Sequence, residues 1–74
     1  MQAKNVNYWL TKGNDPYKMK KFSEAIEYYD KAIELDPNNI GAWINKGEAY
    51  YDLGGHERAL LCFDKALMIN SDDP

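Results

Sequence analysis

The sequence predicts an all-α protein made of two stacked antiparallel helix pairs. Two observations support this prediction: apolar residues recur at helical spacing in four stretches, and a set of residues in the first half returns 34 positions later. The composition agrees, because 74 residues that are 45% hydrophobic and 28% charged are typical of one small globular unit rather than a disordered chain. We therefore treat residues 1–74 as a single domain.

The first predicted helix covers residues 6–14, where an aromatic pair precedes a glycine. Residues 1–5 lack an apolar period, so we expect a frayed lead-in there. Pro16 lacks an amide hydrogen, and a proline inside a helix costs about 3 kcal/mol, which predicts a break or kink near residue 15. Residues 17–21 would then form a connection whose lysines face solvent.

The second predicted helix, residues 22–35, shows the clearest helical pattern. Four of its residues fall at i, i+4, i+7 and i+8 and share one face: Ala25, Tyr29, Ala32 and Ile33. Pro37 cannot donate a backbone hydrogen bond and disfavours the α conformation at the preceding residue, so the helix is expected to end at about residue 35 or 36.

A turn at residues 36–39 precedes the third predicted helix, residues 40–53, and Asn38 or Asn39 can cap it. The expected core face of this helix consists of Trp43, Ala49, Tyr50 and Leu53. Gly54 and Gly55 end the helix, because glycine adopts a positive φ without steric penalty.

The fourth predicted helix covers residues 56–69, and residues 70–74 form a polar, loose tail. Its expected core residues are Ala59, Phe63, Ala66 and Leu67. Their spacing repeats that of the second helix, so the two helices are expected to occupy equivalent positions.

The two halves correspond residue by residue. The pairs 34 positions apart are Trp9 and Trp43, Lys12 and Lys46, Gly13 and Gly47, Ala25 and Ala59, Tyr29 and Phe63, Asp30 and Asp64, Lys31 and Lys65, and Ala32 and Ala66. This pattern resembles the tetratricopeptide repeat, with one repeat at residues 6–39 and a second at 40–73. The resemblance implies a short right-handed solenoid segment in which small residues let the helices approach closely.

The chain also departs from the family pattern. A lysine replaces the leucine that usually precedes each glycine, and we expect the lysine stems to stay in the packing. Asp15 and Pro16 replace small and aromatic core residues, and Ser71 stands where the closing proline is expected. We hypothesise that Tyr17 takes over part of the role of the missing tyrosine.

Neither catalysis nor cofactor binding is expected. His56 is the only histidine and Cys62 the only cysteine, so the side chains needed for a structural zinc site or a catalytic constellation are missing. A net charge of −3 and a pI of about 4.9 argue against nucleic-acid binding. The sequence shows no export signal or membrane span, so we expect a cytoplasmic protein.

The resemblance implies that the first helix of each repeat lines a concave groove that binds a peptide or helical segment of a partner protein. The residues expected to face this groove are Asn7, Leu10, Asn14 and Tyr17 in the first repeat, and Gly41, Ile44, Asn45, Glu48, Tyr51 and Asp52 in the second.

Some proteins that the chain resembles hold a C-terminal carboxylate of heat-shock chaperones in a clamp of lysines, asparagines and an arginine on three such helices. Asn14 and Asn45 match its asparagines, whereas Leu10 stands at its first lysine and a third such helix is missing from this sequence. We therefore expect Leu10 and Ile44 to contact a neutral or amphipathic segment.

The fourth helix carries a second apolar surface, and no third repeat follows to cover it. Its residues are Leu60, Leu61, Leu67, Met68 and Ile69. Stacked repeats normally need about three units or polar caps. The alternative to a binding module is therefore a section of a longer array, or a chain that pairs with itself as a homo-oligomer, with no separate ligand.

Overall fold

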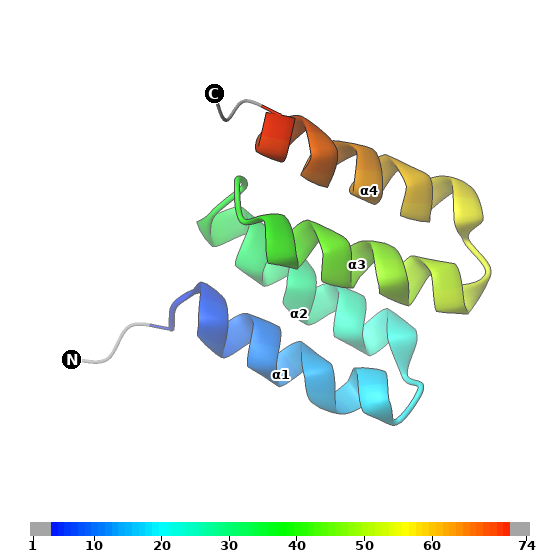
Figure 1. The fold of residues 1–74 in the computed structure, drawn as a ribbon. Coiled ribbons are helices and arrows are strands. Elements are labelled where there is room, and N and C mark those ends of the chain that lie inside the picture. Colours follow the sequence, from blue (N-terminus) through cyan, green and yellow to red (C-terminus); the bar gives the residue numbers. More distant parts are fainter. Residues whose placement is uncertain (1–3, 72–74) are drawn as a thin grey trace.

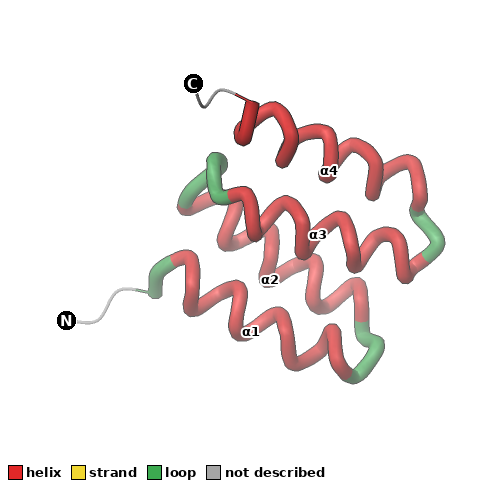
Figure 2. The backbone as a smooth tube through the Cα atoms, viewed as in Figure 1, coloured by secondary structure: helices red, strands yellow, loops and turns green. Residues whose placement is uncertain are grey.

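The computed structural model describes residues 4–71, which fold into four helices (Figure 1). The helices are α1 (Val6–Lys18), α2 (Phe22–Leu35), α3 (Ile40–Leu53) and α4 (His56–Ser71). Each helix packs against the next one along the chain. Short turns at alternating ends make neighbouring helices antiparallel (Figure 2). The predicted all-α fold of two stacked helix pairs is therefore confirmed.

The two helices that open the repeats begin with the same cap. The amide of Tyr8 donates to Asn5 Oδ1, and the amide of Ala42 donates to Asn39 Oδ1, both at 2.9 Å. An asparagine cap satisfies one of the amides that the first helical turn leaves without a backbone partner. The expectation of a frayed lead-in is therefore wrong for Asn5, and residues 1–3 lie outside the described part of the chain.

Helix α1 runs unbroken through Pro16 to Lys18, so the predicted break near residue 15 is wrong. The reason is the position of the proline in the last turn of the helix. Its missing amide removes only the bond to the carbonyl of Lys12, and two helical residues follow it. Pro16 is also buried, so contacts with the rest of the fold offset the lost hydrogen bond.

Both helices that open the repeats also end in the same way. Lys20 has a φ of 63° and Gly54 has a φ of 93°, and these residues are 34 positions apart. In each case the amide of the next residue reaches back to a carbonyl in the last helical turn, at 2.8 Å. This left-handed ending costs energy at a lysine and little at a glycine.

The core lies where α1 and α3 meet α2. Its buried cluster consists of Ala25, Ile26, Tyr29 and Ala49, and the side chains packed against it are those of Leu10, Tyr17, Phe22 and Tyr50. Alanines at the crossings let the helices approach closely, and Tyr29, which is only 1% exposed, fills the remaining space.

Two glycines make room for aromatic rings of the second helix in each repeat. A Cβ atom added to Gly13 would lie 2.6 Å from Cε1 of Tyr29, and one added to Gly47 would lie 2.6 Å from Cε1 of Phe63. Real Cβ atoms do not come this close to other atoms, so the recurrence of glycine at these two positions follows from the ring that lies against each.

Some expected core residues are exposed in the structure. Leu53 is 49% exposed and Leu67 is 64% exposed, whereas Ile26, which the pattern left out, is 7% exposed. Helix α4 also continues two residues beyond the expected end, which makes residues 70 and 71 helical instead of a loose tail. Residues 72–74 of that tail lie outside the described part of the chain.

Candidate functional site

Helix α3 presents a row of exposed side chains at the positions predicted to face a groove. Tyr51 is 58% exposed and Ile44 is 37% exposed. Gly41, Glu48 and Asp52 are exposed too, and Asn45 is half-buried. These residues recur every three or four positions, so they share one face of the helix.

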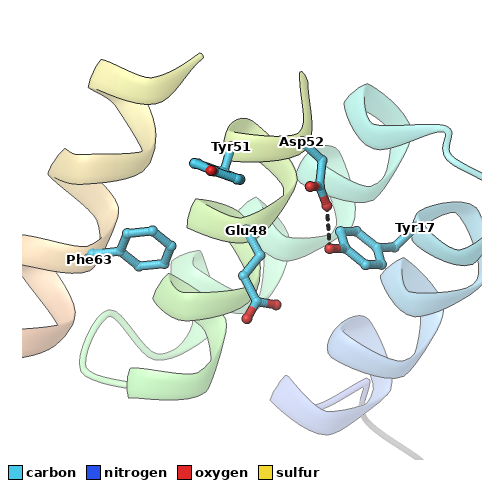
Figure 3. Close-up of a pocket in the computed structure, with 5 residues that line it drawn as sticks. All are labelled: Tyr17, Glu48, Tyr51, Asp52 and Phe63. Atoms are coloured by element: carbon cyan, nitrogen blue, oxygen red, sulfur yellow. Dashed lines mark hydrogen bonds between the residues drawn. The ribbon is translucent and has the colours of Figure 1, made fainter. Parts of the chain in front are cut away.

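A hollow of about 350 Å³ lies on this face. It is lined by Tyr17, Glu48, Tyr51, Asp52 and Phe63. Figure 3 shows that Tyr17 comes from α1 and Phe63 from α4, on either side of α3, which carries the other three residues. The fold thus brings four of the predicted residues together with one residue that was assigned to the core.

Tyr17 and Asp52 connect the two repeats across the hollow. The phenol of Tyr17 donates a hydrogen bond of 2.5 Å to Oδ2 of Asp52, from a position 35 residues away in the sequence (Figure 3). This hydrogen bond, together with desolvation and the negative charge of Asp52, raises the pKa of Tyr17 to about 12. The phenol therefore remains a neutral donor at physiological pH.

The ring of Tyr17 also packs into the fold, as hypothesised. It meets Phe22 edge to face with a centroid distance of 5.3 Å and lies against the buried cluster. Tyr17 thus supplies aromatic packing next to Pro16, which occupies the position of the usual tyrosine, although α1 is not broken there.

Two predicted groove residues of α1 take part in the packing instead of lining the hollow. Oδ1 of Asn14 accepts a hydrogen bond of 2.8 Å from the phenol of Tyr29. Desolvation, followed by the charge of Glu48, raises the pKa of Tyr29, which keeps that donor protonated. Leu10 packs against the buried cluster. Asn7 is exposed in the first turn of α1 and does not line the hollow.

Sequence reasoning missed Phe63 as a wall of the hollow. Its counterpart Tyr29, 34 residues earlier, is covered by α3, whereas Phe63 is only half-buried within residues 4–71. The repeat contained a signal for this exposure. Phe63 on α4 is equivalent to Tyr29 on α2, so it would be covered in the same way only if another helix packed beyond α4.

A second hollow, of about 520 Å³, extends the site past the Tyr17–Asp52 pair. Tyr17 and Asp52 line both hollows, and Lys18, Lys20 and Phe22 complete the second one. The extended site therefore has carboxylates at Glu48 and Asp52 and ammonium groups near the turn after α1.

Phenol, phenyl and carboxylate groups line the first hollow. Within residues 4–71 no three carboxylate, histidine or cysteine side chains are grouped so that they could hold a metal ion. Burial raises the pKa of the Cys62 thiol, so thiolate formation is disfavoured. His56 packs on the ring of Tyr51, with centroids 4.8 Å apart. No helix in this part of the chain is long and apolar enough to cross a bilayer.

The apolar surface predicted on α4 is largely exposed. Leu60, Leu61, Leu67 and Met68 are each between 61% and 69% exposed. Ile69 is half-buried, because at about 100° per residue it lies on the side of α4 that carries the buried Cys62, away from the other four side chains. We call the four exposed residues the α4 stripe.

Comparisons with known proteins agree with this architecture. A family model described as "TPR repeat" matches residues 13–54, and a second one, described as "Tetratricopeptide repeat", matches residues 40–73. The Hsp70-Hsp90 organising protein of Plasmodium falciparum (isolate 3D7) is 56% identical over 27 residues, which are 36% of this chain and 5% of that protein. The first family match covers more than half of the chain. This chain therefore belongs to the tetratricopeptide repeat family.

Proposed function

We propose that this chain binds a peptide or helical segment of another protein on the face formed by α1 and α3. Membership of the tetratricopeptide repeat family supports a protein-interaction scaffold in general. The observation that carries the specific proposal is the hollow between Tyr17 and Phe63, with Ile44 and Tyr51 exposed on the same helix face. Exposed apolar and aromatic side chains beside a hollow are typical of binding sites.

The chemistry of the hollow suggests an amphipathic ligand. Tyr51 and Phe63 offer apolar surface to one or two side chains of a bound segment, while Glu48 and Asp52 attract a basic group. Leu10 packs in the core at the position where the chaperone clamp has a lysine, which favours a segment that needs no carboxylate clamp. Hsp70 and Hsp90, which appear in the name of the relative, are the first full-length partners to test.

The test is a binding titration with a double variant, Ile44→Ala with Tyr51→Ala. Purified Hsp70, purified Hsp90 and a panel of amphipathic peptides are titrated into the isotope-labelled chain. We expect at least one of them to bind at α3, and the double variant to weaken that binding by about tenfold or more, because central apolar contacts carry most of the affinity of small interfaces.

Leu53→Ala provides the matched control. Leu53 also lies on α3 and is 49% exposed, but it points away from the hollow. The control is expected to change affinity by less than about twofold. Equal losses for the control and the double variant, or binding by the double variant at wild-type affinity, would contradict the proposal.

The second candidate function is a structural or self-associating section of a larger array. The α4 stripe favours it, because burying about 300 Å² of apolar surface is worth about 7 kcal/mol before the costs of association. We expect wild-type protein to self-associate at high concentration and a Leu60→Glu, Leu67→Glu variant to remain monomeric. A wild-type chain that sediments as a monomer at millimolar concentration would rule out self-association.

A further inference from the structure

Another hollow, of about 400 Å³, lies between α3 and α4 on a different side of α3. Trp43, Lys46 and Tyr50 of α3 and Arg58, Leu61 and Lys65 of α4 line it. At about 100° per residue, its α3 residues lie on average about 130° around the helix from Ile44, Glu48 and Tyr51. We propose that this hollow, here called the cationic hollow, binds an acidic segment of a protein partner.

Contacts within the fold hold the aromatic floor of the cationic hollow in place. The indole Nε1 of Trp43 donates a hydrogen bond of 2.7 Å to the carbonyl of Pro37, which fixes the ring at the start of α3. Nζ of Lys46 lies 5.5 Å from the centroid of Trp43, and Nζ of Lys65 lies 5.9 Å from it. Cations at this distance from an indole face are attracted to it.

All charged residues that line the cationic hollow are cations. Lys46 has a partner, because its Nζ lies 2.7 Å from Oδ1 of Asp30 on α2. For Arg58 and Lys65, the part of the chain that the structure describes supplies aromatic contacts and no carboxylate within ion-pair distance. Two positive charges therefore face the hollow without a neutralising acid.

The first repeat shows that this charge pattern is not a general feature of the fold. Lys65 corresponds to Lys31, whose Nζ lies 5.8 Å from the centroid of Trp9, so the lysine over a tryptophan recurs. However, the residues 34 positions before Arg58 and Leu61 are Glu24 and Glu27. The same face is thus acid-bearing in the first repeat and purely cationic in the second.

An acidic protein segment fits the cationic hollow better than a nucleic acid does. The whole chain has a net charge of −3, and a phosphate backbone extending beyond the hollow would meet that negative field. Leu61, which is 69% exposed, places apolar surface beside the cations, where it can contact an aliphatic side chain between two carboxylates. This hollow and the hollow at Tyr51 share no lining residue and face different sides of α3, so each can be occupied independently of the other.

The experiment uses an end-blocked synthetic peptide that alternates glutamate with leucine, titrated into the isotope-labelled wild-type chain. The indole resonance of Trp43 is expected to shift, and affinity is expected to fall as salt rises, because exposed charge pairs are screened. Lys65→Glu is expected to weaken binding by about tenfold, since it removes one attraction and adds one repulsion. Arg58→Gln provides a second, smaller perturbation in the same direction.

Lys31→Glu is the matched control. It makes the same charge change over the equivalent tryptophan of the first repeat and is expected to weaken binding by less than about threefold. A peptide with glutamine in place of glutamate is expected not to bind. Equal losses for Lys65→Glu and Lys31→Glu, equal binding of the glutamine peptide, shifts centred on Tyr51, or tighter binding of a single-stranded oligonucleotide would each overturn the proposal.

Discussion

Replacing Gly13 with alanine tests whether the close approach of α1 and α2 depends on the missing side chain. The new Cβ would lie 2.6 Å from Cε1 and 2.9 Å from Cδ1 of Tyr29, and 3.2 Å from the carbonyl oxygen of Ala25. Ordinary contacts begin near 3.4 Å, so the ring has to move by about 0.8 Å. Tyr29 is 1% exposed, and its phenol is hydrogen-bonded to Asn14 at 2.8 Å, so no free space receives the ring.

The expected loss in the free energy of unfolding is about 2 kcal/mol. Overpacking costs about 1–3 kcal/mol, and weakening the bond between Tyr29 and Asn14 adds about 0.5–1.5 kcal/mol. The higher helix propensity of alanine reduces this loss in the free energy of unfolding by about 1 kcal/mol. For a domain of this size the melting temperature should fall by roughly 8–16 °C.

Gly47→Ala is the matched comparison within the same chain. Its new Cβ would meet Cε1, Cδ1 and Cζ of Phe63 at 2.6, 2.9 and 3.0 Å, and no backbone atom is among these nearest contacts. Phe63 is half-buried and can swing toward the open hollow, so the gain in helix propensity nearly cancels the cost. We expect a loss of about 0–1 kcal/mol.

Urea unfolding followed by circular dichroism at 222 nm measures both variants. Equal losses for the two alanine variants would refute the claim that the burial of Tyr29 makes the first contact the more sensitive one. A neutral Gly13→Ala variant would refute the close approach itself. Combining Gly13→Ala with Tyr29→Leu, which removes the clashing ring atoms, should cost less than the sum of the single changes.

Two further predictions concern the end of α1 and its connection to α3. Lys20→Gly should raise the free energy of unfolding by about 0.5–1 kcal/mol because φ is positive at residue 20. Gly54→Lys should lower the free energy of unfolding by about 1 kcal/mol for the same reason. Urea unfolding that shows no change for either variant would contradict the left-handed ending of these helices. Tyr17→Phe should cost about 1 kcal/mol at pH 7 by removing the bond to Asp52. Folding raises the pKa of Tyr17 from 10.0 to about 12, so this stabilisation is fully present below pH 10 and is lost as the pH rises from 10 to 12. Urea titrations from pH 8 to pH 12 measure the difference in free energy of unfolding between the wild type and Tyr17→Phe. A difference that stays constant over this range would argue against the hydrogen bond.

Periodicity and repetition predicted the helices well. The bounds of α3 and the C-terminal end of α2 agree with the expected ones, because a cap, a proline or a glycine pair marks them in the sequence. The end of α1 was missed because a proline in the last helical turn looks the same in the sequence as one that breaks a helix. Its burial against other residues decided between the two outcomes.

The candidate site was predictable only in part. Helical spacing placed Glu48, Tyr51 and Asp52 on one face, since that relation is local. The hydrogen bond between Tyr17 and Asp52 joins residues 35 positions apart, and the wall formed by Phe63 depends on which helices lie beside it. Neither relation follows from the spacing of residues within one helix.

By itself, the sequence determined the four helices and their pairing into two repeats. These properties depend on backbone propensity and on a pattern that the chain contains twice. Only the tertiary structure decided that Tyr29 is covered while Phe63 is half-open, and that the cations around Trp43 converge on one hollow. Periodicity specifies which face of a helix a residue occupies, but burial and charge clustering depend on what the neighbouring helices place against that face.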